Sequence, residues 1–422
     1  MLQETILQQK VERNKLIQID YQPRCYHEQV EKYLKSNLMK LITGPRRAGK
    51  SVFSLLLLRG KRFAYLNFDD DKLLKEFDEE HIMQVLKEVY SDYDYLLLDE
   101  PQNLPNWDLW VSKLYRRGYN LVITGSNSNL LSSEMASLLT GRYLSIEILP
   151  FSLRETLEYR KSNFNPALPE DKADFMLQVE DYFHYGGYPE IINNRDITES
   201  YLKTLFDSII MKDIVRRYKV RKVEELYQFA TYMISIFTSP FTYSSITEEL
   251  GLSSKTTVQK FCTYLKNCYL FFYLPRYNHK LKLMQKAPQK VYIVDNGFLS
   301  SSAFQISENK GRLLENLVLL EFIRRKYEIG KNLFYYRNQS DKEVDFVVRE
   351  NNVVRQLVQV CWDMSNPKTQ KREIGSLMAC AKDFPNGELF VITWNEQKEI
   401  TMNEKIIHVI PYYKWCLSYS IS

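Results

Sequence analysis

The feature that most constrains this chain is the eight-residue loop GPRRAGKS at residues 44–51. An apolar segment precedes it at residues 38–43, and a second one follows directly at residues 52–58. This strand–loop–helix context makes the G-x-x-x-x-G-K-S match a phosphate-binding P-loop rather than an ordinary Gly-rich turn. The two glycines let the backbone curl so that its N–H groups point at phosphate oxygens, and the start of the helix adds positive potential there.

The residues of this loop predict how a nucleotide is held. Lys50 is expected to reach the β- and γ-phosphates, and the Ser51 hydroxyl to ligate Mg²⁺. The cofactors predicted on this basis are ATP and Mg²⁺. The expected nucleotide contacts are Gly44, Arg47, Ala48, Gly49, Lys50, Ser51 and Val52.

A second motif is the acidic pair Asp99 and Glu100, which directly follows an apolar strand at residues 95–98. Strands that alternate with helices predict a parallel sheet covered on both faces, with ligands at the carboxyl ends of its strands. There Asp99 is expected to support Mg²⁺ and Glu100 to polarise the attacking water as general base. This pair favours an ATP hydrolase over a P-loop kinase. The alternative is a pair of solvated acids that opens a loop.

Two further candidates follow the next strands. Ser126 and Asn127 come after the strand at residues 121–124 and are placed to sense the γ-phosphate, unless they are only loop residues. Arg142 stands before the strand at residues 143–148 and is a candidate arginine finger on the nucleotide of a neighbouring subunit. Its alternative role is that of a surface arginine.

Six stretches of the sequence resemble one known family. They are GPRRAGKS, YLLLDEPQNL, LVITGSNSNLL, LLTGRYLSIEILPFSLRE, YFHYGGYPEI and MKDIVRRYKV. The chain resembles, from about residue 20 to its end, the bacterial and archaeal AAA-type ATPases that carry a C-terminal domain of unknown function numbered 4143. The resemblance implies an ASCE-class P-loop domain, ATP hydrolysis and self-association, and no single biological role.

The middle of the chain is basic and helical. Residues 212–222 carry six Lys and Arg against one acid, either as a binding surface or as a solvated face. Residues 243–250 and 254–261 read as two helices joined by a tight turn, and the aromatic and basic residues 269–282 as a hairpin wing. No acid occurs from Lys255 to Lys290. This composition predicts salt-dependent contact with nucleic acid, DNA of low sequence specificity, through Lys255, Lys260, Arg276, Lys280 and Lys282.

Such a winged helix has a second possible role, as a lid or an oligomer contact.

The last third of the chain combines a helix with Glu315, a strand with Asp345 and a third strand with Gln359. This is the order of PD-(D/E)xK nucleases, whose carboxylates hold Mg²⁺ and whose lysine positions water. Gln359 and Cys361 stand where Glu and Lys are required, so we expect a vestigial nuclease-like scaffold without cleavage, retained for packing or for binding nucleic acid or a partner. Lys368 is a candidate substitute for the lysine, although nothing in the sequence places it near the carboxylates.

The fold class predicted is α/β, with a P-loop NTPase (ASCE/AAA-type) parallel sheet, a helical and winged-helix segment, and a small nuclease-like α/β domain. The expected domains are residues 1–155, 156–287 and 288–422, which suits a chain of 422 residues. Scattered cysteines and the absence of a signal peptide or a long apolar run predict a cytoplasmic protein without membrane contact.

The predicted activity is that of a Mg²⁺-dependent ATPase, a candidate homo-oligomer, whose nucleotide state controls nucleic-acid or partner binding. Two alternatives stay open. One is an ATP-gated DNA- or protein-binding switch with negligible turnover, and the other is an ATP-dependent nuclease.

Overall fold

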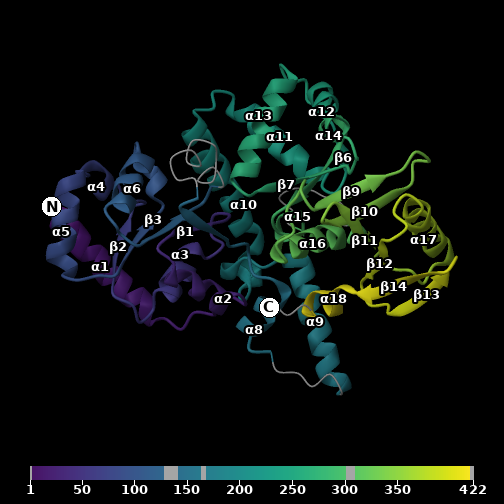
Figure 1. Cartoon of the computed structure of the whole chain (residues 1–422), viewed down its shortest axis with the longest axis horizontal. Coiled ribbons are helices and arrows are strands. Elements are labelled where there is room, and N and C mark those ends of the chain that lie inside the picture. Colours follow the sequence, from purple (N-terminus) through teal and green to yellow (C-terminus); the bar gives the residue numbers. More distant parts are fainter. Residues whose placement is uncertain (1, 128–140, 163–167, 301–308, 419–422) are drawn as a thin grey trace. The chain divides into compact units, whose positions relative to one another are not determined.

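The computed structural model describes residues 2–127, 141–162, 168–300 and 309–418. It divides the chain into two compact units (Figure 1). The first comprises residues 1–150 with the short segment 267–269, and the second residues 151–266 and 270–422. The expected boundary at residue 155 lies close to this division.

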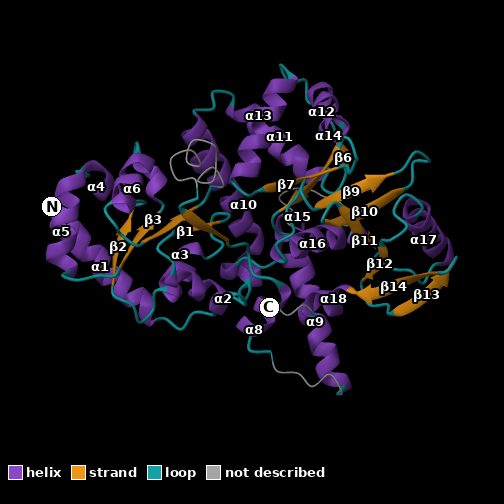
Figure 2. Ribbon diagram, viewed as in Figure 1, coloured by secondary structure: helices purple, strands orange, loops and turns teal. Residues whose placement is uncertain are grey.

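Over most of its described residues, the first unit alternates helices and strands (Figure 2). Its elements are α1 (Leu2–Gln18), α2 (His27–Glu31), η1 (Lys32–Lys35), β1 (Met39–Thr43), α3 (Lys50–Leu57), β2 (Phe63–Asn67), α4 (Asp71–Lys75), α5 (Glu79–Tyr90), β3 (Tyr95–Asp99), η2 (Pro101–Asn103), α6 (Trp107–Arg116), β4 (Leu121–Gly125) and β5 (Tyr143–Glu147).

The strands of this unit form one five-stranded parallel sheet in the order β2-β3-β4-β1-β5. β4 therefore separates the strand before the loop at residues 44–51 from the strand that ends in Asp99. The predicted parallel sheet of the P-loop NTPase class is confirmed. Its register sets Asp99 opposite Thr124 and Thr43 opposite Glu147, so the carboxyl ends of these strands lie along one edge.

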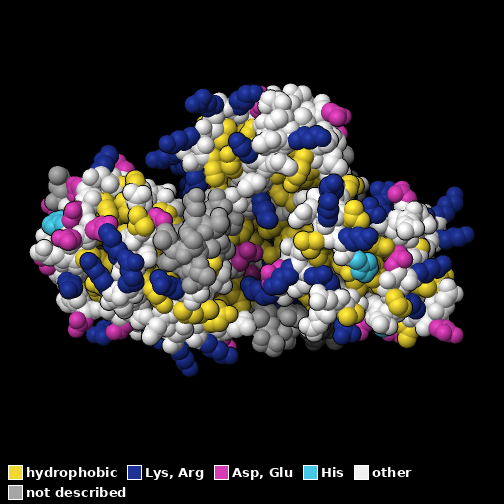
Figure 3. All heavy atoms as spheres, turned by 45° about the horizontal axis from the view of Figure 1, so that its top comes forward, with side chains coloured by type: hydrophobic (Ala, Val, Ile, Leu, Met, Phe, Trp, Pro, Cys, Tyr) yellow, Lys and Arg dark blue, Asp and Glu magenta, His cyan; other side chains and the backbone are white. Residues whose placement is uncertain are grey.

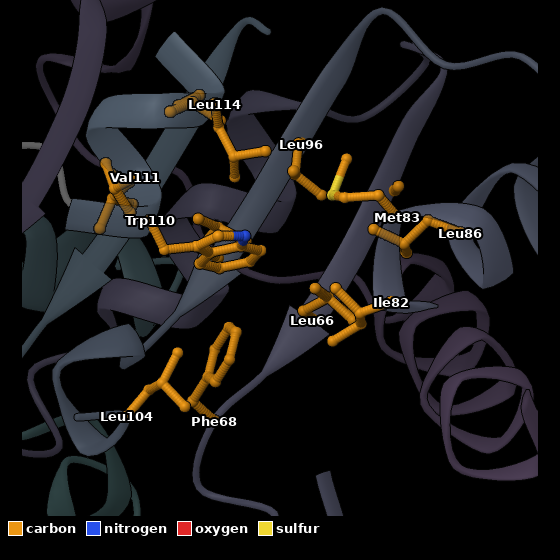
Figure 4. Close-up of a cluster of buried hydrophobic side chains, with 14 of the residues drawn as sticks. Leu66, Phe68, Ile82, Met83, Leu86, Leu96, Leu104, Trp110, Val111 and Leu114 are labelled. Atoms are coloured by element: carbon orange, nitrogen blue, oxygen red, sulfur yellow. The ribbon is translucent and has the colours of Figure 1, made fainter. Parts of the chain in front are cut away.

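Both faces of the sheet are buried, which explains why its strands are nearly continuous apolar runs. Leu96 and Leu98 pack on one face in a cluster with side chains of α1, α5 and α6, which Figure 4 shows around Phe68 and Trp110. Leu97, between them, packs on the other face with α2 and α3.

A side chain protects the edge strand β2. The Gln9 amide of α1 donates to the Asn67 carbonyl oxygen (3.1 Å) and accepts from the Asn67 N–H (2.9 Å). It thereby satisfies a backbone N–H and a backbone C=O group of the kind that an exposed edge strand offers to other chains.

The second unit begins with helices and continues into two sheets. Its elements are α8 (Leu153–Tyr159), α9 (Pro169–Tyr185), η4 (Pro189–Ile191), η5 (Arg195–Ile197), α10 (Thr198–Ser208), the π-helix η6 (Ile209–Arg216), α11 (Val223–Ser235), β6 (Pro240–Phe241), α12 (Tyr243–Glu249), α13 (Lys255–Asn267), β7 (Phe271–Pro275), α14 (Leu281–Lys286), β8 (Gln289–Ile293), α15 (Gly297–Ser300), α16 (Lys310–Arg324), β9 (Leu333–Arg337), β10 (Glu343–Glu350), β11 (Val353–Val360), α17 (Pro367–Ala381), β12 (Glu388–Thr393), β13 (Lys398–Met402), β14 (Lys405–Pro411) and α18 (Tyr412–Leu417). α13 extends into the segment that groups with the first unit.

A three-stranded antiparallel sheet, β6-β8-β7, accompanies the two helices predicted at residues 243–261. β6 precedes these helices in the chain, and β7 and β8 follow them. The expected second wing strand within residues 276–282 is wrong. β7 instead pairs with β8, and the chain between them forms the short helix α14. The physical reason is burial: Tyr277 packs into the core of the next sheet, while the apolar residues of β8 complete the pairing. The expected domain boundary at residues 287/288 falls inside this hairpin.

The last third forms a six-stranded mixed sheet in the order β13-β14-β12-β11-β10-β9. β9 and β10 form an antiparallel hairpin, and β11 and β12 run parallel with α17 between them in sequence. The C-terminal α/β sheet domain is therefore confirmed. Among the residues described, no helix is both long and apolar enough to cross a membrane.

Candidate nucleotide-binding site

The backbone of the loop after β1 requires its glycines. Gly44 adopts φ 147°, and a Cβ there would overlap the Ile148 carbonyl oxygen, so no larger residue fits. Gly49 adopts φ 88° and caps α3. These two positions let the chain leave the strand, turn back and enter the helix within a few residues.

Lys50 and Ser51 are the first two residues of α3. The Lys50 side chain is buried, donates from Nζ to the Pro45 carbonyl oxygen (2.9 Å) and lies 3.8 Å from Glu100 Oε1. The Ser51 hydroxyl donates to Asp99 Oδ1 (3.0 Å), across 48 residues of sequence. The loop and the acidic pair therefore form one site.

Asp99 ends β3 in a buried polar environment. It accepts hydrogen bonds from Ser51, from the Tyr65 hydroxyl (3.1 Å) and from the Thr124 hydroxyl. Burial raises the pKa of Asp99 to about 6, with a further increase from the neighbouring Glu100 carboxylate. The hydroxyl oxygen of Ser51 and the carboxylate of Asp99 are oxygen donors of the type that Mg²⁺ prefers, so the side chains present fit that ion.

Glu100 follows in a left-handed conformation, φ 54°. Its carboxylate accepts from the Ser126 N–H and hydroxyl, both at 3.2 Å, and from the Gln102 side-chain amide. The carboxylate is thus fixed between Lys50 and the end of β4. From this position it can accept a proton from a water molecule bound nearby.

The structure places the other predicted nucleotide contacts as follows. Ser126 and Asn127 are both buried after β4, and Ser126 bonds to Glu100 rather than standing free in a loop. Ala48 is buried, Val52 is half-buried and Arg47 is exposed in a left-handed conformation, φ 65°.

Arg142 lies away from these residues. It precedes β5, whose first residue pairs with Met39 at the start of β1, so Arg142 is at the edge of the sheet opposite the P-loop. Its guanidinium lies over the ring of Tyr115, 5.9 Å from the centroid. Residues 128–140, which lie between β4 and Arg142 in the sequence, are outside the described residues.

Four side chains of the site were not among the predicted residues. Tyr65 and Thr124 bond Asp99, Gln102 bonds Glu100, and Arg24 donates from its guanidinium to the Ala48 carbonyl oxygen. Strand periodicity was the available signal for Thr124, since it lies near the end of the strand next to Asp99. Nothing in the sequence marks Arg24, which comes from the connection between α1 and α2.

The residues predicted to contact nucleic acid have different environments in the second unit. Lys255 and Lys260 are exposed on α13, and Lys280 and Lys282 are exposed at α14. Arg276 is different: it is half-buried and donates to the Arg337 carbonyl oxygen. Figure 3 shows Lys and Arg side chains on several parts of one face of the molecule, with Asp and Glu among them.

The predicted vestigial residues lie on three elements of the second unit: Glu315 on α16, Asp345 on β10 and Gln359 on β11. Glu315 and Asp345 are brought together, since both contact the ammonium of Lys290. Gln359 instead donates to Glu373 of α17 (2.8 Å). The lysine in the cluster is thus Lys290, while the expected substitute, Lys368, is exposed at the start of α17.

The five-stranded parallel sheet and the P-loop with its acidic pair define a P-loop ATPase domain of the AAA type. Comparison with known families agrees: residues 36–157 match an AAA domain, residues 176–310 a domain of unknown function numbered 8612, and residues 310–415 the domain of unknown function numbered 4143. The chain belongs to the family that combines this AAA domain with a C-terminal domain 4143.

Relatives that match most of the chain are found in two distant organisms. The chain is 32% identical over 420 residues to the uncharacterized protein MJ1544 of Methanocaldococcus jannaschii, covering 96% of this chain and 93% of that protein. It is 30% identical over 359 residues to an uncharacterized protein of Haemophilus influenzae, covering 80% and 86%. Among solved structures, the Walker-type ATPase PABY2304 of Pyrococcus abyssi superposes with a TM-score of 0.43 at 15% identity, over 69% of this chain and 100% of that one.

Proposed function

We propose that this protein binds ATP with Mg²⁺ and hydrolyses it. The observation that carries the proposal is the convergence of the P-loop with the acidic pair: Ser51 bonds Asp99, and Lys50 lies 3.8 Å from Glu100. Lys50 would neutralise the β- and γ-phosphates, while Ser51 and Asp99 would hold Mg²⁺, which stabilises the charge that develops on the leaving phosphate. Glu100 would orient and deprotonate the attacking water.

The hydrogen bonds of Glu100 suggest how hydrolysis is linked to the bound nucleotide. Ser126 and Lys50 both contact the Glu100 carboxylate. If Lys50 moves to the phosphates of ATP, it leaves this carboxylate, which can then accept a hydrogen bond from the attacking water. Ser126 and Asn127 would then sense the γ-phosphate from the end of β4.

The test is Glu100→Gln, with Glu80→Gln on the exposed face of α5 as a matched control. We expect the Glu100 variant to lose steady-state phosphate release by at least about 100-fold, the size of a general-base contribution, and to bind ATP as tightly as the wild type. Glu80→Gln should leave both unchanged. Wild-type phosphate release at background level, with ATP bound, would instead establish the slow switch.

A second function, nucleic-acid binding, is favoured by the arrangement of α11, β6, α12, α13, β7 and β8. This order of three helices and three strands supports the predicted winged helix, and α13 presents Lys255 and Lys260 while it buries Val258 and Phe261. We propose that this surface contacts the DNA backbone with little sequence preference.

Salt dependence tests this second proposal. Replacing Lys255 and Lys260 by Glu should weaken binding of a labelled DNA duplex and lower the slope of log K against log salt by about 2, one unit for each lost phosphate contact. A control with the same change of charge is Lys368→Glu with Lys371→Glu on the exposed part of α17. Equal loss in both double variants would show only a general effect of net charge.

A further inference from the structure

The candidate with the most complete geometry outside the nucleotide site is a buried ionic cluster in the second unit. Lys290 of β8 is 2% exposed, and its Nζ lies 3.0 Å from Glu315 Oε1, 3.1 Å from Asp345 Oδ1 and 2.8 Å from Glu343 Oε1. The first two carboxylates are themselves buried. Burying a charge to this extent is costly, and oppositely charged groups around it offset that cost.

The oxygens of Glu315 and Asp345 are already occupied by donors from the protein. Glu315 Oε1 accepts from Lys290 and from the Tyr292 hydroxyl (2.7 Å). Asp345 Oδ1 accepts from Lys290, and Oδ2 accepts from the Val360 N–H (2.9 Å). Hydrogen bonds within the protein therefore satisfy three of the four oxygens of these two carboxylates.

We infer that Lys290 takes the place of a divalent cation in this cluster, so that the C-terminal domain holds its nuclease-like carboxylates together without a metal and does not cleave phosphodiester bonds. A Mg²⁺ ion bound to Glu315 and Asp345 would lie about 2.0–2.1 Å from their oxygens. The ammonium bridges the same two oxygens, so a cation cannot share this position without strong charge repulsion.

The contacts of Lys290 and Gln359 agree with a structural, non-catalytic role of this cluster. The ammonium of Lys290 is held by three acceptors and is not available to position water, and Gln359 adds no carboxylate because its amide donates to Glu373. Among the residues that the structure describes, no group of three or more His, Cys, Asp or Glu side chains is arranged to hold a metal ion.

Through Lys290, the ionic cluster connects two parts of the second unit. Lys290 belongs to the three-stranded sheet, while Glu315 and Asp345 belong to α16 and β10. The ionic cluster therefore fastens β8 to the C-terminal part of the same unit. The Tyr335 hydroxyl strengthens this attachment by donating to the Pro288 carbonyl oxygen (2.8 Å).

The test is to remove the lysine and measure Mn²⁺ binding by electron paramagnetic resonance, in full-length protein without nucleotide. In Lys290→Ala we expect a Mn²⁺ site that depends on Asp345 and binds Mn²⁺ at least 10-fold more tightly than any Asp345-dependent site of the wild type. Adding Asp345→Asn should abolish this site. Mn²⁺ should also raise the melting temperature of Lys290→Ala more than that of the wild type, because a ligand of the folded state stabilises it.

A second buried lysine provides the control. Lys40 of β1 is fully buried and its ammonium donates to the Ser36 carbonyl oxygen, with no carboxylate in that bond. Lys40→Ala should therefore create no Mn²⁺ site. If Lys290→Ala does not fold, the double variant Lys290→Ala/Glu343→Gln removes one of the repelling carboxylates and keeps Glu315 and Asp345.

Three results would overturn the inference. The first is Mn²⁺ binding to the wild type that Asp345→Asn weakens, which would show a metal site despite Lys290. The second is a folded lysine-free variant that gains no Asp345-dependent site. Cleavage of plasmid DNA by the wild type with Mg²⁺ or Mn²⁺, lost in Asp345→Asn, would restore the nuclease alternative.

Discussion

Asp99 is a carboxylate that is costly to bury, at the position where we propose that Mg²⁺ is held. Its carboxylate is 5% exposed, and burial with the nearby Glu100 charge raises its pKa to about 6. Ser51, Tyr65 and Thr124 donate hydrogen bonds to it, which lower the pKa but do not offset burial. A bound Mg²⁺ would supply the missing positive charge, so the unfavourable burial of Asp99 favours the binding of nucleotide with metal.

This gives a prediction about pH for the nucleotide-free protein. Because the folded state has a raised pKa at Asp99, it binds more protons than the unfolded state, and the contribution of Asp99 to stability falls as the pH rises from about 4 to about 6. Asp99→Asn removes this dependence. The free energy of unfolding of the variant minus that of the wild type should increase by about 2–3 kcal/mol between pH 4 and pH 7.

Denaturant unfolding of both proteins at several pH values measures this difference. The constant loss of hydrogen bonding in Asp99→Asn cancels, since only the change with pH is compared. A difference that stays flat over the range would mean that Asp99 is not the group that takes up the proton.

At the scale of elements, a turn between α9 and η4 depends on glycine. Phe151 N–H donates to the Gly187 carbonyl oxygen (2.8 Å), and Gly187 N–H donates to Asp295 Oδ2 (2.8 Å). A Cβ at Gly187 would overlap the Phe151 carbonyl oxygen. This close backbone approach gives a physical reason for the glycine pair in the stretch YFHYGGYPEI.

Gly187→Ala should therefore destabilise the second unit by at least about 2 kcal/mol, as overpacking against fixed backbone does. Gly375→Ala is the matched control, because Gly375 is exposed in α17 with nothing within 4 Å of its added Cβ. It should stabilise α17 by about 0.5–1 kcal/mol. Thermal unfolding of the two variants compares them directly, and equal melting temperatures would contradict the role of Gly187.

The elements also show how much of the fold could be predicted from the sequence alone. The P-loop and the strands of the first sheet could be predicted because buried parallel strands are short apolar runs that end in polar residues. β8 could not be assigned to the hairpin, because a helix and the buried Tyr277 separate it from β7. The burial of Lys290 could not be predicted for a similar reason. A lysine in a basic stretch of sequence is expected to be exposed, and only the fold brings Glu315 and Asp345 to it.

At the scale of the whole molecule, the site of the first unit contains every predicted catalytic residue except Arg142. β1 is five residues long, so about 15 Å of strand separates Arg142 from the P-loop of its own chain. An arginine side chain cannot cover that distance. If Arg142 stabilises the transition state, a second copy of the chain has to accept it, and the active form is an oligomer.

Mixing two inactive variants tests this arrangement. Lys50→Ala should lose ATP binding and Arg142→Ala should lose hydrolysis by about 10³-fold or more, the size of an arginine-finger effect. When the two are mixed, the subunit with an intact P-loop can receive Arg142 from the Lys50→Ala subunit, so phosphate release should return and rise with protein concentration. Arg117→Ala on the same unit serves as a control that keeps wild-type activity. No recovery on mixing, together with full activity of Arg142→Ala alone, would show that the transition-state charge is neutralised by another group.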